Sequence, residues 1–211
     1  QQLNPHFLFN TLNNIRATIL EDPEKARDAL SQLSEMLRYT LQQQQSKVLL
    51  AQELAITHEY IALCKIQFEA RLKFTCEVAE KAKHALIPRL LLQLCVENAV
   101  KHGIAKIREG GLIHLKIDVE NLAHKHQAQL SIVVTNPIAQ GGASYLKKGH
   151  LPEDASPGMG IKNIQQRLSL MYADSRKTKA SLSFKKDKQS ATVRIVLPLE
   201  YDASNKDAEC E

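Results

Sequence analysis

Apolar residues in the first third of the chain recur at the spacing of an α-helix. One stripe predicts a helix over residues 3–20, and it consists of Leu8, Leu12, Ile15 and Ile19. Asp22-Pro23 is a helix-start signal, and the second stripe behind it consists of Ala26, Leu30, Leu33, Leu37 and Leu41. Two helices joined by so short a turn are expected to form an antiparallel hairpin. Because a two-helix unit cannot bury both stripes, a second copy is expected to complete a four-helix bundle.

A different period follows a third predicted helix over residues 51–68. Beyond Arg71 apolar and polar residues alternate, which indicates strands over 72–78, 113–119, 130–134, 182–184 and 193–197. Pro88 is expected to open a leucine-rich helix that runs to His102, and another helix is predicted over 160–171. Residues 136–157 are rich in Gly, Ser, Pro and Lys, and irregular chain of this length often forms a functional lid.

These elements predict an α+β fold, in which an N-terminal helical hairpin precedes an α/β sandwich with its helices on one face of a mixed sheet. The expected domains are the hairpin over residues 1–50 and the sheet domain over 51–199, followed by a polar, frayed tail over 200–211.

Composition narrows the classes of partner. The net charge of +5 is diffuse and suits an anionic small ligand, and no basic run interleaved with aromatics supports direct nucleic-acid binding. The cysteines have neither CxxC nor zinc spacing, which favours a reducing, cytoplasmic setting; they are Cys64, Cys76, Cys95 and Cys210. No segment reaches the roughly 20 apolar residues of a membrane span. Because the chain begins without Met, a sensor or a membrane anchor is expected upstream of it.

The run from Pro5 to Asn10 places a single histidine at the start of the first helix. At about 100° per residue, His6, Asn10 and Asn13 share a face other than the apolar stripe, which predicts an imidazole presented to solvent. A neutral imidazole there is an adequate nucleophile near pH 7. An exposed helical histidine without a task is the alternative.

A second polar cluster lies near the end of the leucine-rich helix, where Glu97, Asn98, Lys101 and His102 fall within two turns. A Glu97–Lys101 pair, a C-terminal cation and a glycine stop account for three of these residues. They leave Asn98, a mediocre helix former, unexplained. Its amide oxygen suits Mg²⁺, and Lys101 one turn on is placed to reach phosphates.

Gly158 and Gly160 stand directly before the predicted helix over 160–171. Glycines at a helix N-terminus let backbone amides approach an anion such as phosphate. Lid hinges or a simple turn would use the same two residues.

Together these segments resemble the LytS/YehU-type bacterial sensor histidine kinases. The resemblance extends from residue 1 to about residue 199, and the runs that carry it are Gln2–Asn10, Leu37-Arg38-Tyr39, Glu97–Gly103, Gly158–Asn163 and Gln166-Arg167-Leu168. It implies a homodimeric helical module followed by a Bergerat-type (GHKL) ATP-binding domain.

The resemblance also implies roles for individual residues. His6 would accept the γ-phosphoryl group of ATP and pass it to an aspartate on a response regulator. Asn98 would hold Mg²⁺, and the phosphate side would be lined by Lys101 and His102. The glycine-rich end of the ATP lid would comprise Gly158 and Gly160, and Asn163 would belong to the nucleotide-binding residues, as its position in the motif implies.

The chain departs from the wider pattern at three positions. Phe7 stands where many histidine kinases have an acidic residue, so Glu97 is our hypothesis for the base. Leu94 replaces the Asn or Glu four residues before the metal-binding Asn, which favours a kinase over a hydrolytic ATPase. Asn136 replaces the aspartate that reads the adenine amino group and keeps an acceptor oxygen, whereas Ile138 replaces the first glycine of that segment.

Two rival functions remain open. The first is a catalytically weak pseudokinase, the same fold acting as an interaction or phosphatase-type module with poor ATP binding. The second is a GHKL-type ATPase or protein serine kinase, which has no use for the Pro5-His6-Phe7 run.

Overall fold

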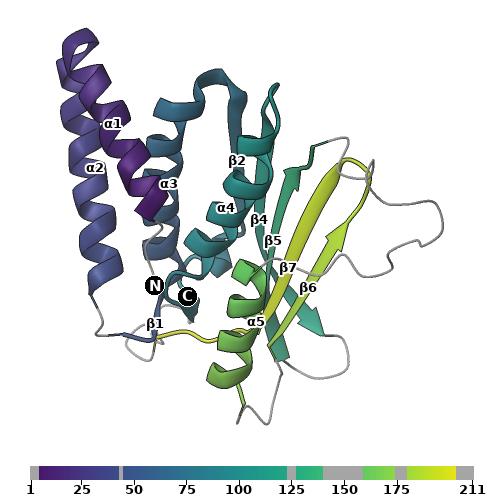
Figure 1. The fold of residues 1–211 in the computed structure, drawn as a ribbon. Helices are drawn as coiled ribbons and strands as arrows, with labels where there is room; N and C mark the ends of the chain where they lie inside the picture. Colours follow the sequence, from purple (N-terminus) through teal and green to yellow (C-terminus); the bar gives the residue numbers. More distant parts are fainter. Residues whose placement is uncertain (1–4, 43–44, 123–126, 140–158, 174–179, 203–211) are drawn as a thin grey trace.

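The computed structural model describes residues 5–42, 45–122, 127–139, 159–173 and 180–202 of the 211-residue chain. Helices α1 (Pro5–Glu21) and α2 (Pro23–Leu41) form the expected antiparallel hairpin (Figure 1). Asp22 caps α2, because its carboxylate accepts a hydrogen bond from the Lys25 backbone N–H at 3.0 Å. The helix-start signal at Asp22-Pro23 is therefore confirmed.

The apolar stripes of the hairpin are only partly buried. On α2 the buried residues are Ala26, Ala29, Leu33, Met36 and Thr40, whereas Leu30 and Leu41 are 50% and 69% exposed. On α1, Ile15 is buried, but Leu12 and Ile19 are 46% and 50% exposed. The hairpin packs on α3 along one side only, so part of each stripe faces outward within the described chain, as expected of a two-helix unit.

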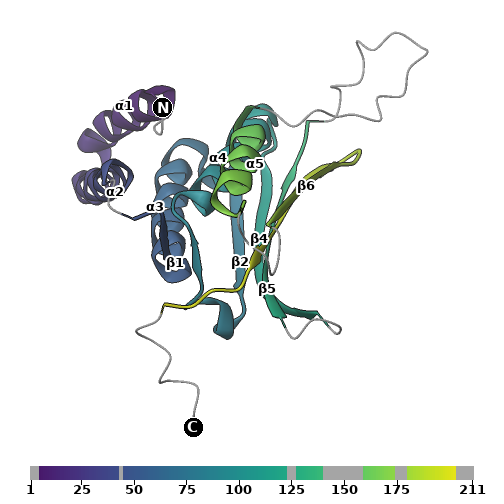
Figure 2. The same cartoon turned by 90° about the horizontal axis from the view of Figure 1, so that it is seen from below.

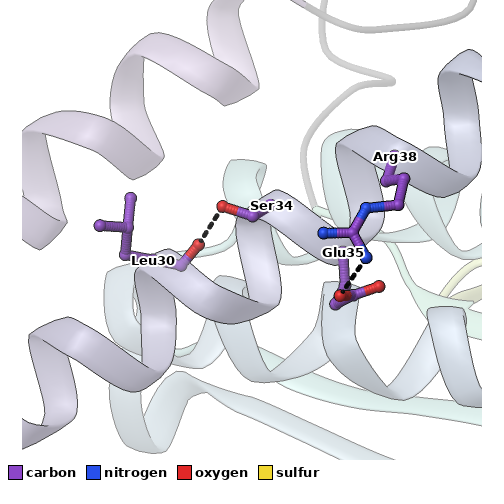
Figure 3. Close-up of polar contacts among 4 residues, drawn as sticks. All are labelled: Leu30, Ser34, Glu35 and Arg38. Carbon is purple, nitrogen blue, oxygen red and sulfur yellow. Dashed lines mark hydrogen bonds and ion pairs between the residues drawn. The ribbon is translucent and has the colours of Figure 1, made fainter.

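The exposed face of α2 also carries polar side chains that interact within the helix. Ser34 donates to the carbonyl of Leu30 at 2.8 Å, and Arg38 pairs with Glu35 at 2.8 Å (Figure 3). Arg38 of the Leu37-Arg38-Tyr39 run therefore makes its ion pair on an exposed surface, where such a pair contributes little to stability.

A two-stranded ladder connects the hairpin to the rest of the chain. Strand β1 (Lys47–Leu49) pairs antiparallel with β3 (Leu86–Pro88), and α3 (Leu50–Phe68) follows β1 directly. Pro88 was expected to open the leucine-rich helix; instead it ends β3, opposite Lys47. Leu90 then takes a left-handed conformation with φ of 63°, so α4 (Leu91–His102) begins only after it.

The main sheet has the strand order β2-β4-β5-β7-β6. Its strands are β2 (Leu72–Val78), β4 (Gly111–Leu122), β5 (Gln127–Pro137), β6 (Ser181–Lys186) and β7 (Ser190–Pro198). The β2–β4 pair is parallel, and the other neighbouring pairs are antiparallel. Figure 2 shows α3, α4 and α5 (Met159–Met171) on one face of this sheet, with the hairpin outside α3. This arrangement confirms the predicted mixed sheet with helices on one face.

The core lies between the sheet and these helices. Alternate strand residues are fully buried against them, among them Ile113, Leu115, Ile117, Leu130 and Ile132. Cys64 and Cys95 are buried in the same core as free thiols, as expected, and Cys76 is half-buried. None of the helices in the described residues is long and apolar enough to cross a membrane.

The chain after β7 is fixed as far as Tyr201. The Leu86 N–H donates to the Glu200 carbonyl at 2.7 Å, and the Tyr201 hydroxyl donates to the Lys81 carbonyl at 3.1 Å. The expectation of a frayed tail from residue 200 is corrected for Glu200 and Tyr201, because backbone and side-chain hydrogen bonds hold them. Residues 203–211 lie outside the described part.

Candidate functional site

Helix α4 presents its polar residues on two different sides. Asn98 and His102 are one turn apart, as are Glu97 and Lys101, and about 100° of helix rotation separates the two pairs. Its apolar residues, including Leu92, Cys95, Val96 and Ala99, are buried and hold the helix in the core. The two polar pairs therefore open onto two separate cavities.

The first cavity, here called the α4–α5 cavity, has a volume of about 350 Å³. It lies where α4, the start of α5 and the ends of three strands meet, and its lining residues are Asn98, His102, Lys106, Asn136, Ile138, Ala139, Ile161, Phe184, Lys186 and Ala191. Three of the residues singled out in the sequence, Asn98, His102 and Asn136, are thus brought together.

Asn98 contacts both its own helix and α5. Its amide nitrogen donates to the Leu94 carbonyl at 2.7 Å, one turn back. Its Oδ1 faces Gly160, where a Cβ would lie only 2.3 Å from that oxygen. Glycine at position 160 therefore permits the backbone of α5 to approach the Asn98 amide directly.

Asn136 is the next-to-last residue of β5 and is 7% exposed. Its Nδ2 donates to the Pro137 carbonyl at 2.8 Å, which fixes the plane of the amide. Gly103 packs closely on it, since a Cβ there would lie 2.7 Å from Nδ2. The glycine that ends α4 thus brings this helix against the end of β5.

The second cavity, here called the α1–α4 cavity, has a volume of about 360 Å³. Phe7 and Asn10 of α1 line it together with residues of α3 and α4, which are Tyr60, Cys64, Gln67, Phe68, Glu97, Val100 and Lys101, and with Ala105. The rings of Phe7 and Tyr60 are 4.9 Å apart between centroids. The first turn of α1 is therefore packed beside the Glu97 side of α4.

The remaining predicted site residues are not gathered at the α4–α5 cavity. Lys101, expected beside Asn98 and His102, lines the α1–α4 cavity, because helix rotation turns it toward Glu97. Asn163 is exposed on α5 and lines neither cavity. His6 belongs to the first turn of α1, but its side chain lies outside the described part, as does Gly158.

Sequence reasoning missed several lining residues of the α4–α5 cavity. Lys106 belongs to the short 3-10 turn over Ile104–Lys106, which follows α4 after Gly103, so helical spacing did not point to it. Phe184, Lys186 and Ala191 come from β6 and β7, and only the strand order brings them to α4. The described residues contain no group of three or more His, Cys, Asp or Glu that could hold a metal ion.

Comparisons with known proteins agree with the motifs. Residues 1–72 match the model of the family described as Histidine kinase. The chain is 31% identical over 201 residues to the Sensor protein LytS of Staphylococcus haemolyticus, covering 93% of this chain and 33% of that protein. It is 29% identical over 203 residues to the Sensor histidine kinase/phosphatase LytS of Staphylococcus aureus, covering 94% of this chain and 33% of that protein. The chain thus spans about a third of the length of these relatives.

Two solved structures are similar at low sequence identity. The catalytic domain of histidine kinase ThkA matches with a TM-score of 0.48 at 11% identity, covering 76% of this chain and 100% of that chain. The mycobacterial sensor histidine kinase MprB matches with a TM-score of 0.46 at 14% identity, covering 74% of this chain and 98% of that chain.

The electrostatics of the α4–α5 cavity can be tested at His102. Partial burial, followed by the positive charges of Lys106 and Lys101, lowers the pKa of this imidazole. In Lys106→Ala we expect the His102 pKa to rise, as measured by NMR titration of the ligand-free protein. Lys116→Ala, an exposed lysine on β4, is the control and should leave the titration unchanged.

The sign of the effect on stability follows from the same shift. A histidine whose folded-state pKa is lowered is harder to protonate in the folded protein, so its protonation favours unfolding as the pH falls below about 6.5. An unmoved His102 pKa in Lys106→Ala would contradict the assigned cause.

Proposed function

Because the chain is a homologue of the LytS-type sensor histidine kinases, we propose that it is the kinase core of such a protein. In this proposal His6 is phosphorylated from Mg-ATP, and the phosphoryl group then passes to an aspartate on a response regulator. The observation that carries the proposal is the convergence of Asn98, His102 and Asn136 on one cavity of about 350 Å³.

The lining of the α4–α5 cavity suits a nucleotide. Its volume falls in the usual range of ligand pockets, about 300–1,000 Å³. Ile138, Ile161 and Phe184 supply apolar contacts for a base, and the Asn136 amide oxygen is an acceptor for the adenine amino group. Positive charge for the phosphates is available from Lys106 and Lys186.

Asn98 is the protein ligand that we assign to Mg²⁺. A single amide oxygen fits a cation that keeps most of its waters and shares its ligands with the phosphates. The close approach of Gly160 to this oxygen supports the assignment, because it lets the first turn of α5 reach the same point. Bound there, the metal would neutralise charge on the transferring phosphoryl group.

The α1–α4 cavity supports a role for Glu97 near the phosphoacceptor. Phe7 and Asn10 follow His6 in the sequence within about one helical turn. Both line this cavity together with Glu97. A carboxylate beside the first turn of α1 is suitably located to accept a proton from an imidazole, the task that Phe7 cannot perform. Lys101 lines the same cavity, and we assign it to stabilising charge there.

One observation favours the pseudokinase as a second candidate. The side chain of Ile138 lines the α4–α5 cavity at the position where the family pattern has a glycine, and it occupies space beside Asn136. The second candidate therefore predicts weak nucleotide affinity, whereas the first predicts a nucleotide-dependent phosphoprotein.

The proposed autokinase is tested with γ-labelled ATP and Mg²⁺. We expect an acid-labile, alkali-stable label on the wild-type protein and none on His6→Gln, because the substitution removes the accepting nitrogen. Nucleotide affinity, measured by calorimetry, should be equal in both proteins. Absence of label in the wild type together with weak nucleotide binding would favour the pseudokinase, and free phosphate without labelled protein would favour the ATPase.

The proposed base is tested by Glu97→Gln, which keeps the shape of the side chain and removes its basicity. We expect the rate of autophosphorylation to fall about 100-fold or more, the usual effect of losing general base catalysis, while nucleotide affinity is unchanged. Glu59→Gln, on the neighbouring helix α3, is a matched control. An undiminished rate in Glu97→Gln would exclude this role.

We also propose that the outward apolar residues of the hairpin bind a second copy of the chain. Phe9, Leu12, Ile19, Leu20, Leu30 and Leu41 are all at least 46% exposed. Burying such residues yields about 25 cal/mol per Å² of apolar surface, so their pairing in a four-helix bundle is favourable.

The pairing is tested by light scattering on Leu12→Glu/Leu30→Glu. We expect the wild type to be a dimer and the variant a monomer, because two charges would enter the apolar interface. Leu170→Glu, at a residue that is 73% exposed on α5, should remain dimeric. A monomeric wild type would contradict the proposed pairing.

A further inference from the structure

Glu53 is a buried carboxylate without a role in the proposed chemistry. It lies in the first turn of α3 and is 1% exposed. It accepts hydrogen bonds from the Tyr39 hydroxyl at 2.5 Å, from the Leu90 N–H at 2.6 Å and from the Leu92 N–H at 3.2 Å. These donors belong to α2 and to the start of α4, so one side chain of α3 contacts both neighbouring helices.

The start of α4 depends on this carboxylate. The N-cap residue, Leu90, has no side chain that can cap the helix, and its φ of 63° is unfavourable for a non-glycine residue. Glu53 instead satisfies the Leu90 and Leu92 N–H groups from outside the helix. A negative charge at this end of the helix is also favoured by the helix dipole.

Tyr39, in the last turn of α2, connects the hairpin to the Glu53 carboxylate. Its hydroxyl donates to Glu53, and the guanidinium of Arg89, which is 7% exposed, lies 4.2 Å from the centroid of its ring. The guanidinium of Arg89 therefore packs on the ring whose hydroxyl contacts Glu53. Burial raises the pKa of Glu53, and the hydrogen bonds from Tyr39, Leu90 and Leu92 and the charge of Arg167 oppose that rise.

Two of the runs that carry the family resemblance, Leu37-Arg38-Tyr39 and Gln166-Arg167-Leu168, contain residues that influence Glu53. In Leu37-Arg38-Tyr39, Arg38 pairs with Glu35 on the exposed surface (Figure 3), whereas Tyr39 turns inward to Glu53. The positive charge of Arg167, in the Gln166-Arg167-Leu168 run, opposes the rise of the Glu53 pKa that burial causes. The hairpin, α3 and the start of α4 therefore meet at this carboxylate.

We propose that Glu53 is a positioning residue that ties the hairpin to the N-terminus of α4 through the Tyr39 hydroxyl, and so holds the first turn of α1 in place beside α4. The inference rests on the proposed kinase function and adds to it a fixed geometry between phosphoacceptor and nucleotide cavity. Loss of the tie lets the hairpin move relative to α4, which lowers the fraction of time in which His6 is correctly placed.

The test is Tyr39→Phe, which removes one hydroxyl and keeps the ring on Arg89. We expect kcat for autophosphorylation to fall about tenfold, since small misplacements of reacting groups are costly, while KM for ATP is unchanged because Tyr39 lies outside the α4–α5 cavity. Tyr201→Phe is the matched control: it also loses one hydroxyl hydrogen bond, to Lys81, and should leave kcat unchanged.

Hydrogen exchange gives a readout that does not require phosphorylation. In Tyr39→Phe we expect faster exchange in the last turn of α2 and the first turn of α4, and no change in Tyr201→Phe. Glu53→Gln is a second variant that keeps the volume of the side chain but presents an amide group to the N–H donors, and it should accelerate exchange at Leu90 and Leu92.

The outcomes separate the two proposals. An unchanged or raised kcat in Tyr39→Phe, or an effect on KM alone, overturns the positioning role even if stability falls. If the wild type forms no phosphohistidine, the kinase proposal fails, and exchange decides the inference: faster exchange in both helices supports the tie, and unchanged exchange overturns it.

Discussion

Backbone N–H groups at the start of a helix need acceptors, and in α4 that need is met by a carboxylate from another helix. Glu53 is buried, and three donors satisfy its carboxylate, namely the Tyr39 hydroxyl and the Leu90 and Leu92 N–H groups. The N-terminus of α4 is thereby fixed to α3 rather than to the preceding loop. Every residue that α4 presents, from Asn98 to His102, takes its position from this attachment and from the buried apolar side of the helix.

Helix α4 then separates two cavities whose polar residues are adjacent in the sequence. Asn98 and His102 face the end of the sheet and α5, whereas Glu97 and Lys101 face α3 and the first turn of α1. A single helix therefore contacts both the proposed nucleotide site and the segment that carries His6.

The sequence predicted most of the fold because its signals are local. The Asp22-Pro23 start, the alternating strands and the glycine after His102 each specify their own element. Pro88 was misplaced because proline suits both a helix start and a strand end, and only the pairing of β1 with β3 decides between them. Periodicity found the stripes on the hairpin but not which part of each stripe faces α3. Glu53 gave no signal, because its partners Tyr39 and Leu90 meet it only in the folded chain.

Gly160 shows how the structure distinguishes interpretations that the sequence left open. If Gly160 served only as a hinge or a turn, its backbone freedom would matter, and a β-carbon at this position would meet open space. Here a β-carbon would lie 2.3 Å from Asn98 Oδ1 and 2.5 Å from its Nδ2, so the absence of a side chain is a packing requirement. The start of α5 and the Asn98 amide therefore form one contact, and displacement of α5 must alter the surroundings of Asn98.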